Sequence, residues 1–464
     1  MSSLETPFPY QLVGAQWLAT MPQALLADEM GLGKSAQTIL AADMVGAKDI
    51  LVVCPASVRI NWEREFERFS PMDRPCTVLM SGKDKVPAAG VVVCSYDMLQ
   101  AFSHVFKARA WDVLVLDEAH YLKERSAQRT KAVYGRGAKW PGLAASAKRV
   151  WRLTGTPAPN DASELWTHLK SMGVTQSDYW DFTFRYCSGF DSNYGFKITG
   201  HKNVEELKGI LKTIMLRRKK EEVLTELPPI TFHHVTVDRS HVDLDPVFFE
   251  QLHKLGPDTV EAQNKFYGNL KVADTSLRQA LAAVASSGRP NEARLGLLES
   301  MGSSLGTLRR YIGMSKLPAC VDIIKEDLDA NPDMKIVIFA VHMSVIEEAR
   351  LRLAKYGAVT LYGGTPAAKR QQNIDKFQKN PKCRVFIGNV QAAGVGITLT
   401  AANQVVFIEQ SWVPADNAQA AMRCHRIGQT KHVHVRIMSL HKSVDEQVNE
   451  TLTRKTRELT KLDF

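Results

Sequence analysis

Short runs of consecutive apolar residues recur along the chain, separated by segments with helix-like spacing. A run that is apolar at every position is typical of a strand buried on both faces of a parallel sheet. Five such runs lie in the first third of the chain, and five more follow from residue 336. They span residues 24–27, 50–54, 91–94, 113–116, 150–153, 336–341, 359–362, 385–387, 405–408 and 433–437. The pattern predicts an α/β protein with two parallel-sheet lobes in tandem.

The residues between the two sets of apolar runs differ in composition and spacing. It holds aromatic residues, a basic cluster and then Leu227-Pro228-Pro229, where the prolines end any helix and suit a hinge. Residues 246–311 have helical spacing and no strand run. We therefore expect four parts: an N-terminal lobe at 1–172, a helical and basic linker with the hinge at 173–230, a helical insertion at 231–315 and a C-terminal lobe at 316–464.

Composition narrows the class of protein. Of 464 residues, 45% are hydrophobic and 23% charged, which is a globular composition and argues against a disordered chain. No apolar stretch approaches the roughly 20 residues of a membrane-spanning helix, and residues 1–6 do not resemble a secretory signal. Seven cysteines without a C-x-x-C pair indicate reduced thiols and no zinc site. We expect a monomeric intracellular protein without a membrane partner, in the cytoplasm or nucleoid of a bacterium or virus, or in a eukaryotic nucleus.

The chain carries a formal net charge of +10 at pH 7. A basic excess suits a polyanionic partner, because neutralisation of phosphates dominates nucleic-acid affinity. Many basic proteins of this size bind no polyanion, so charge alone favours a nucleic-acid partner only modestly.

A phosphate-binding loop is predicted after the first apolar run. Gly31 and Gly33 allow the backbone to approach a phosphate, Lys34 places a cation against the β- and γ-phosphates, and Ser35 can ligate Mg²⁺. Asp28 stands where the usual motif has its first glycine. The alternative is a glycine-rich helix start with a surface lysine. The candidate nucleotide-binding residues of the loop are Asp28, Glu29, Met30, Gly31, Leu32, Gly33, Lys34 and Ser35.

Two adjacent acids end the apolar run at 113–116. Asp117 can hold Mg²⁺, and Glu118 can orient and deprotonate an attacking water. Phosphoryl transfer needs mostly positioning and charge neutralisation, so a lysine loop with an acid pair meets nearly the whole requirement. A solvated turn is the alternative for the acids. For His120, a coupling role and a plain packing role are equally open.

Several motifs together resemble those of the superfamily 2 helicase-like ATPases, in particular the Swi/Snf branch of double-stranded-DNA translocases. They occur in family order along nearly the whole chain. They are D-E-M-G-L-G-K-S at 28–35, V-C-P-A-S at 53–57, S-Y-D at 95–97, D-E-A-H at 117–120, L-T-G-T-P at 153–157, L-R-R-K-K-E-E-V-L at 216–224, Q-A-A-G-V-G-I-T-L-T at 391–400 and H-R-I-G-Q at 425–429. The resemblance implies two RecA-like lobes, ATP with Mg²⁺ as cofactors, and duplex or forked DNA as partner.

The resemblance also implies roles for three further residues. Gln11 matches the glutamine that reads adenine, with a polar helix-start residue as the alternative. Arg423 and Arg426 match arginine fingers that act from the second lobe. Their spacing of three places both on one face if the segment 419–426 is helical. The catalytic set is then Lys34, Glu118, Arg423 and Arg426.

DNA contacts are implied for Ser57, Ser95, Thr398 and Trp412. The hydroxyls or loop amides of the first three would meet phosphates, contacts that fix position without reading bases. Trp412 could equally be a core aromatic. The basic run at 215–220 would dock the lobes or touch DNA, and a solvated charge run is the other reading.

The run Gln391-Ala392-Ala393-Gly394 departs from the common Swi/Snf signature, which has an arginine and paired glycines. It looks more like the annealing-helicase branch, and the absence of a histone-reading module from this sequence counts against nucleosome remodelling. The leading hypothesis is a DNA-stimulated ATPase that moves along duplex DNA, with fork remodelling or strand annealing as its use. A DEAH-type RNA or DNA helicase and a non-catalytic nucleotide-gated DNA-binding module are the competing hypotheses.

Overall fold

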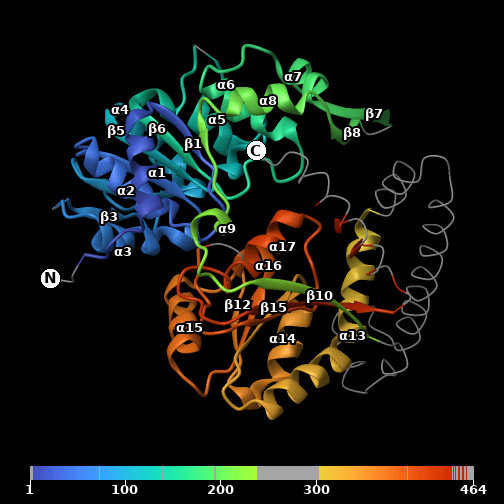
Figure 1. Cartoon of the computed structure of the whole chain (residues 1–464). Coiled ribbons are helices and arrows are strands. Elements are labelled where there is room, and N and C mark those ends of the chain that lie inside the picture. The colour runs from blue at the N-terminus through green and yellow to red at the C-terminus, as the bar shows by residue number, and fades with distance from the viewer. Residues whose placement is uncertain are drawn as a thin grey trace. The chain divides into compact units, whose positions relative to one another are not determined.

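A computed structural model describes residues 4–237 and 302–456, apart from residues 73, 138, 193–194 and 394–395 and short gaps after 441 (Figure 1). The described chain forms two compact units that divide between Leu227 and Pro228. Each unit is built on its own parallel sheet, as the sequence predicts.

Unit 1 contains a seven-stranded parallel sheet in the order β3-β4-β2-β5-β6-β1-β9. Its five central strands are those expected from the apolar runs, and β2 and β4 are buried along their whole length. The edge strands β3 and β9 were not expected, because two or three half-buried residues leave no apolar run. The strands are β1 Gln23–Leu26, β2 Ile50–Cys54, β3 Cys76–Val78, β4 Val91–Ser95, β5 Trp111–Asp117, β6 Ala147–Leu153 and β9 Met215–Leu216.

Helices cover this sheet, and a smaller cluster formed by the segments from α6 to α8 has its own apolar core. Beside α7 and α8, an antiparallel hairpin pairs β7 (Cys187–Ser192) with β8 (Gly195–His201) (Figure 1). The helices of unit 1 are α1 Pro9–Thr20, α2 Lys34–Met44, α3 Arg59–Phe69, α4 Leu99–Ala108, α5 Gln128–Tyr134, α6 Trp166–Ser171, α7 Tyr179–Tyr186, α8 Val204–Leu211 and α9 Lys220–Val223.

Unit 2 contains a six-stranded parallel sheet in the order β10-β15-β14-β11-β13-β12. Its five strands from β11 to β15 confirm the second set of apolar runs. Alternate residues of β11 enter two different apolar clusters, so helices bury both faces of the sheet. The strands are β10 Ile230–Val237, β11 Ile336–Ala340, β12 Val359–Leu361, β13 Val385–Asn389, β14 Gln404–Phe407 and β15 Val433–Leu440.

Strand β10 was not expected, because its polar residues interrupt any apolar run and seven of its eight residues are half-buried or exposed at the sheet edge. It lies in the stretch predicted to be a helical insertion. Residues 238–301 lie outside the described chain, so that insertion and the four-part division remain predictions. The helices of unit 2 are α13 Gly302–Ala330, α14 Met343–Arg352, α15 Ala367–Lys379, α16 Val390–Ala393 and α17 Pro414–Ala421. None of the helices in the described ranges is both long and apolar enough to cross a membrane.

Candidate active site

Three of the predicted motifs follow three adjacent strands of unit 1. The phosphate-loop motif follows β1, L-T-G-T-P follows β6 and the acid pair ends β5. Strand β6 lies between β1 and β5, with Leu26 paired to Leu153 and Leu153 paired to Asp117. Because all three strands are parallel, their carboxyl ends share one edge of the sheet, where open α/β sheets bind ligands.

Glycine is required in the phosphate loop at two positions. Gly31 and Gly33 have φ angles of 91° and 69°, in the left-handed region that other residues rarely adopt. A Cβ atom on Gly33 would lie 2.2 Å from Gln11 Nε2. Helix α2 begins at Lys34, directly after Gly33, so the unbonded amides of its first turn face the loop. Ser35, the second residue of α2, lies half-buried beside Lys34.

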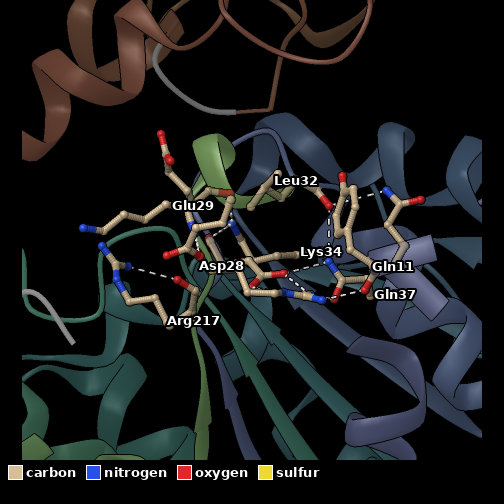
Figure 2. A network of polar contacts seen from close by, with 12 residues as sticks. Gln11, Asp28, Glu29, Leu32, Lys34, Gln37 and Arg217 are labelled. Carbon is tan, nitrogen blue, oxygen red and sulfur yellow. Dashed lines mark hydrogen bonds and ion pairs between the residues drawn. The ribbon is translucent and has the colours of Figure 1, made fainter. Parts of the chain in front are cut away.

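The Lys34 side chain is held inside the loop. Its ammonium donates to the carbonyl oxygens of Asp28, at 2.7 Å, and Glu29, at 3.3 Å (Figure 2). Burial lowers its pKa, while the carboxylates of Glu118, Asp28 and Asp117 act in the opposite direction. The lysine and the acid pair are therefore electrostatically coupled, as the sequence hypothesis requires.

The acid pair is fixed by its surroundings. Trp62 Nε1 donates to Asp117 Oδ2 at 2.8 Å, and the Glu118 backbone N–H donates to Asp117 Oδ1 at 2.9 Å. Burial and the neighbouring Glu118 raise the pKa of Asp117 to about 6, against the lowering effects of Trp62 and Lys34. Glu118 has a φ angle of 50°, a costly conformation for a non-glycine residue that recurs at functional sites.

His120 connects two motifs. Its Nδ1 lies 3.4 Å from Glu118 Oε2 and 3.2 Å from Thr154 Oγ1, and that hydroxyl accepts the Thr156 backbone N–H at 3.1 Å. Gly155, in the same L-T-G-T-P segment, leaves no room for a Cβ atom, which would lie 2.4 Å from Met30 Cγ of the phosphate loop. These contacts link the acid pair to the L-T-G-T-P segment, and the choice between a coupling role and plain packing for His120 remains a prediction.

Asp28 is fully buried at the centre of a charged network that the sequence did not reveal. Arg218 binds both of its carboxylate oxygens, through Nε at 3.0 Å and through Nη2. Gln37 Nε2 donates to Asp28 Oδ2 at 2.9 Å, and Arg218 also donates to the Tyr10 carbonyl and to Gln37 Oε1. The network ties α1, the loop, α2 and the segment after β9 together (Figure 2).

Two neighbours of Arg218 also contact the loop region. Arg217 Nη1 donates to the carbonyl oxygens of Ala27, at 3.0 Å, and Gly155, at 3.4 Å. Lys220 is buried, and its backbone N–H donates to Glu29 Oε2 at 2.8 Å. At these three positions the basic run is not a solvated charge run, because it contacts the phosphate-loop region. Its role in docking the lobes or touching DNA remains a prediction. The sequence held one signal of this contact, namely Asp28 in place of the usual glycine. A buried carboxylate requires a cation nearby, and Arg218 is that cation.

Gln11 uses both ends of its amide within unit 1. Its Oε1 accepts the Phe8 backbone N–H at 2.9 Å at the start of α1, and its Nε2 donates to the Leu32 carbonyl at 3.4 Å. The side chain is 3% exposed. It is therefore a helix-start residue, the alternative reading, and it also contacts the phosphate loop. Adenine recognition by Gln11 remains a prediction.

The arginine pair of unit 2 lies beyond a helix end. Helix α17 ends at Ala421, so the prediction that Arg423 and Arg426 share a helix face is wrong. The chain turns there because the Arg423 carbonyl accepts the Leu399 backbone N–H at 2.9 Å instead of continuing a helix. Arg423 is 7% exposed, and its Nε donates to the Gln419 carbonyl at 3.2 Å.

The H-R-I-G-Q motif is joined to the segment around residue 398. Arg426 Nη1 donates to Thr398 Oγ1 and to the Ile397 carbonyl, each at 3.1 Å. Gln429 Nε2 donates to the carbonyls of Thr400, Ala402 and Cys424 at 2.9–3.3 Å. The predicted DNA-contacting hydroxyl and a predicted arginine finger are therefore direct neighbours.

The other predicted DNA-contacting residues differ in exposure. Ser57 and Trp412 are half-buried, and the Arg309 guanidinium lies 4.6 Å from the centre of the Trp412 ring. Ser95 is 2% exposed. Its buried hydroxyl is not placed to meet a DNA phosphate, so the predicted contact at this position would be made by backbone amides of the loop. Gly394 lies outside the described residues. The roles assigned to these residues remain predictions.

Fold and site together define a helicase-like protein of two α/β units, each built on its own parallel sheet. Residues 10–281 match the SNF2-related domain and residues 315–428 match the helicase conserved C-terminal domain. The chain belongs to the SNF2-related family, and the class of protein expected from its motifs is confirmed.

The similar curated proteins include members of the branch that the sequence motif at residues 391–394 resembles. A Caenorhabditis elegans homolog of the SWI/SNF-related matrix-associated actin-dependent regulator of chromatin subfamily A-like protein 1 is 31% identical over 96% of this chain and 60% of its own length. The mouse DNA annealing helicase and endonuclease ZRANB3 is 30% identical over 94% of this chain and 38% of its own length. The chain thus spans between about two fifths and three fifths of these two relatives.

A solved structure of similar sequence is the Sulfolobus solfataricus SWI2/SNF2 ATPase core in complex with dsDNA. It is 26% identical, covers 97% of this chain and 93% of its own chain, and has a TM-score of 0.43.

Proposed function

We propose that this chain is a DNA-stimulated ATPase that translocates along duplex DNA, with fork remodelling or strand annealing as the process it drives. One observation carries the proposal: Lys34, Asp117 and Glu118 come together at the carboxyl edge of one parallel sheet, with electrostatic coupling between them. Family membership favours this function over the DEAH-type helicase. The competent catalytic residue types also argue against a non-catalytic binding module.

The residues present fit ATP with Mg²⁺. The loop around Gly31 and Gly33 presents backbone amides to a phosphate, and Lys34 supplies a half-buried cation whose ammonium donates to two carbonyl oxygens of the loop. Two adjacent carboxylates, one with a pKa raised by burial and by its neighbour, favour a divalent cation nearby. Ser35 and Asp117 would hold Mg²⁺, which commonly takes one or two protein ligands together with substrate phosphates. Bound there, the ion would neutralise developing phosphate charge.

The protein groups then have separate tasks. Lys34 binds the β- and γ-phosphates and stabilises their charge in the transition state. Glu118 positions the attacking water and accepts its proton, while Trp62 and the Glu118 backbone N–H hold Asp117 in place. Arg423 and Arg426 add positive charge during hydrolysis, a role carried over from the family resemblance.

DNA is the proposed partner on the basis of the family and of the net charge of +10. The relatives named for annealing and chromatin regulation are longer than this chain, so their particular substrates enter here as proposals. We place the protein with DNA, in a nucleoid or a nucleus, and expect a monomer.

The test is the steady-state ATPase rate of E118Q with forked DNA, blunt duplex DNA, single-stranded DNA and RNA. We expect E118Q to bind ATP but hydrolyse it at least ~100-fold more slowly, the scale of losing a general base. The matched control is E205Q, the same change at a side chain that is 88% exposed. Undiminished turnover in E118Q would refute the assigned base, and RNA as the best activator would refute the DNA assignment.

A further inference from the structure

A groove in unit 1 lies away from the phosphate loop, between helices α4 and α5 and the residues Arg136, Trp140 and Pro141. Its volume is about 880 Å³. Among the described residues that line it, the charged ones are four cations and one carboxylate. They are Lys107, Arg129, Lys131, Arg136 and Asp97. Asp97 precedes α4 and Lys107 lies in its last turn, about 15 Å away along the helix axis, so the carboxylate does not neutralise that end of the groove.

Trp140 stands at this groove with 72% of its surface exposed. An indole usually buries most of its apolar body, so an indole this exposed indicates an interaction surface. This side chain adds little to the buried core of the described part of unit 1.

The backbone that carries Trp140 is nevertheless closely tied. The Arg136 backbone N–H donates to the Trp140 carbonyl at 2.9 Å, and the Trp140 N–H donates to the Gly137 carbonyl at 3.1 Å. Gly135 and Pro141 form a β-bridge, and Gly135 has a φ angle of 86° with its missing Cβ position only 2.5 Å from the Trp140 carbonyl. The segment therefore presents the indole on a fixed support, which lowers the entropic cost of stacking a partner on it.

We infer that this groove binds a short unpaired segment of DNA, with a base stacked on Trp140 and its phosphates bound by Lys131 and Arg136. Cations that follow a backbone beside an exposed aromatic ring are the chemistry of single-strand binding. A duplex keeps its bases stacked inside and offers no base face to the indole. The inference rests on the proposed action on DNA and extends it, because it assigns a site for the unpaired arm of a fork.

Other groups near the groove are less suited to phosphate. The Lys107 ammonium donates to the Pro141 carbonyl at 3.2 Å, and the Arg129 guanidinium lies 5.3 Å from the centre of the Tyr121 ring. Lys131 and Arg136 are therefore the better residues to test. Gln100 and Ser103 on α4 add polar groups that suit a base edge.

The experiment measures equilibrium binding of the full chain without nucleotide, by fluorescence anisotropy of labelled oligothymidylate and of a blunt duplex. Loss of one stacked base predicts that W140A weakens oligothymidylate binding roughly 5- to 160-fold, while W140F retains most of the affinity. Duplex binding and basal ATPase rate should change less than about twofold. The fluorescence of a 2-aminopurine base in the oligonucleotide should be quenched when it binds the wild-type protein. It should not be quenched when it binds W140A.

The cations are tested by salt dependence. The double variant K131A/R136A should reduce the slope of log Kd against log salt for oligothymidylate by about 1.4, the value for two phosphate contacts on a single strand. Wild-type affinity in W140A, or an equal loss for blunt duplex, would overturn the inference. These experiments measure binding alone. They can therefore succeed or fail independently of the ATPase test of the proposed function.

Discussion

At the scale of single residues, the phosphate loop depends on side chains far from it in sequence. Arg218 supplies the cation for the buried Asp28, and Gln37 completes the network. Removing one partner of a buried ion pair commonly costs about 3–5 kcal/mol, because the other charge is left without compensation. The loop is therefore positioned by the end of unit 1, some 190 residues further along the chain.

Gly14 provides a sharp test of this network. A Cβ atom there would lie 1.9 Å from Gln37 Oε1 and 2.7 Å from Arg218 Nη2. In an ordinary helix, replacing glycine with alanine stabilises by up to ~1 kcal/mol. Here G14A should destabilise unit 1 by about 1–3 kcal/mol, because the network must move.

The matched control is G209A in α8, where an added Cβ atom meets nothing within 4 Å. It should stabilise by about 0.5–1 kcal/mol. The measurement is urea unfolding of both variants beside the wild type. If both substitutions changed the free energy of unfolding in the same direction, the proposed effect of the network at Gly14 would be wrong.

At the scale of elements, the end of α17 shows how a segment is held without regular structure. The chain after Ala421 makes turns, and Gln429 joins it to the segment around residues 400–402. Its Nε2 donates to three carbonyls, while its Oε1 accepts the backbone N–H groups of Thr430 and Lys431 at 3.0 and 2.9 Å. One buried amide thus pairs with backbone groups of two segments that lack regular structure.

Substitution of Gln429 should therefore weaken unit 2. Q429A leaves buried carbonyls and amides without their partner, and we expect a loss of about 2 kcal/mol or more. Q429E should cost at least as much, because a carboxylate oxygen would face carbonyl oxygens. The control is Q391A, at an exposed side chain, with an expected change within about 0.5 kcal/mol. Urea unfolding checks all three, and a Q429A variant as stable as Q391A would refute this role.

At the scale of the whole molecule, each unit has its own sheet and its own apolar clusters. Unit 1 contains the phosphate loop and the acid pair, whereas unit 2 contains the H-R-I-G-Q motif. Separate cores allow separate unfolding equilibria, so a single free energy of unfolding does not describe such a chain.

We expect hydrogen exchange in urea, resolved by peptide, to show two transitions. G14A should lower the transition reported by β2 and β4, and Q429A the one reported by β13 and β14. ADP at 100 times its Kd should stabilise unit 1 by about 2.7 kcal/mol, since its proposed loop lies there. A single transition moved equally by both substitutions would show that the units unfold together.

The amino-acid sequence by itself determined the class of fold and the chemical groups of the site. Ten apolar runs predicted ten strands, because residues buried on both faces of a parallel sheet are apolar at every position. Short motifs identified Lys34, Asp117 and Glu118, because a local run of residues forms the loop or strand end that presents them. Strands that are very short, such as β9, or rich in polar residues, such as β10, have no continuous apolar run and were not predicted.

Only the tertiary structure decided which cation balances Asp28, where α17 ends and what the basic run after β9 contacts. Each of these depends on contacts between residues distant in sequence, such as Arg218 with Asp28 or Leu399 with Arg423. The same holds for the exposed Trp140, which the sequence analysis did not single out. Local pattern reports burial and periodicity, whereas pairing of buried charges and closure of backbone hydrogen bonds arise only when distant segments meet.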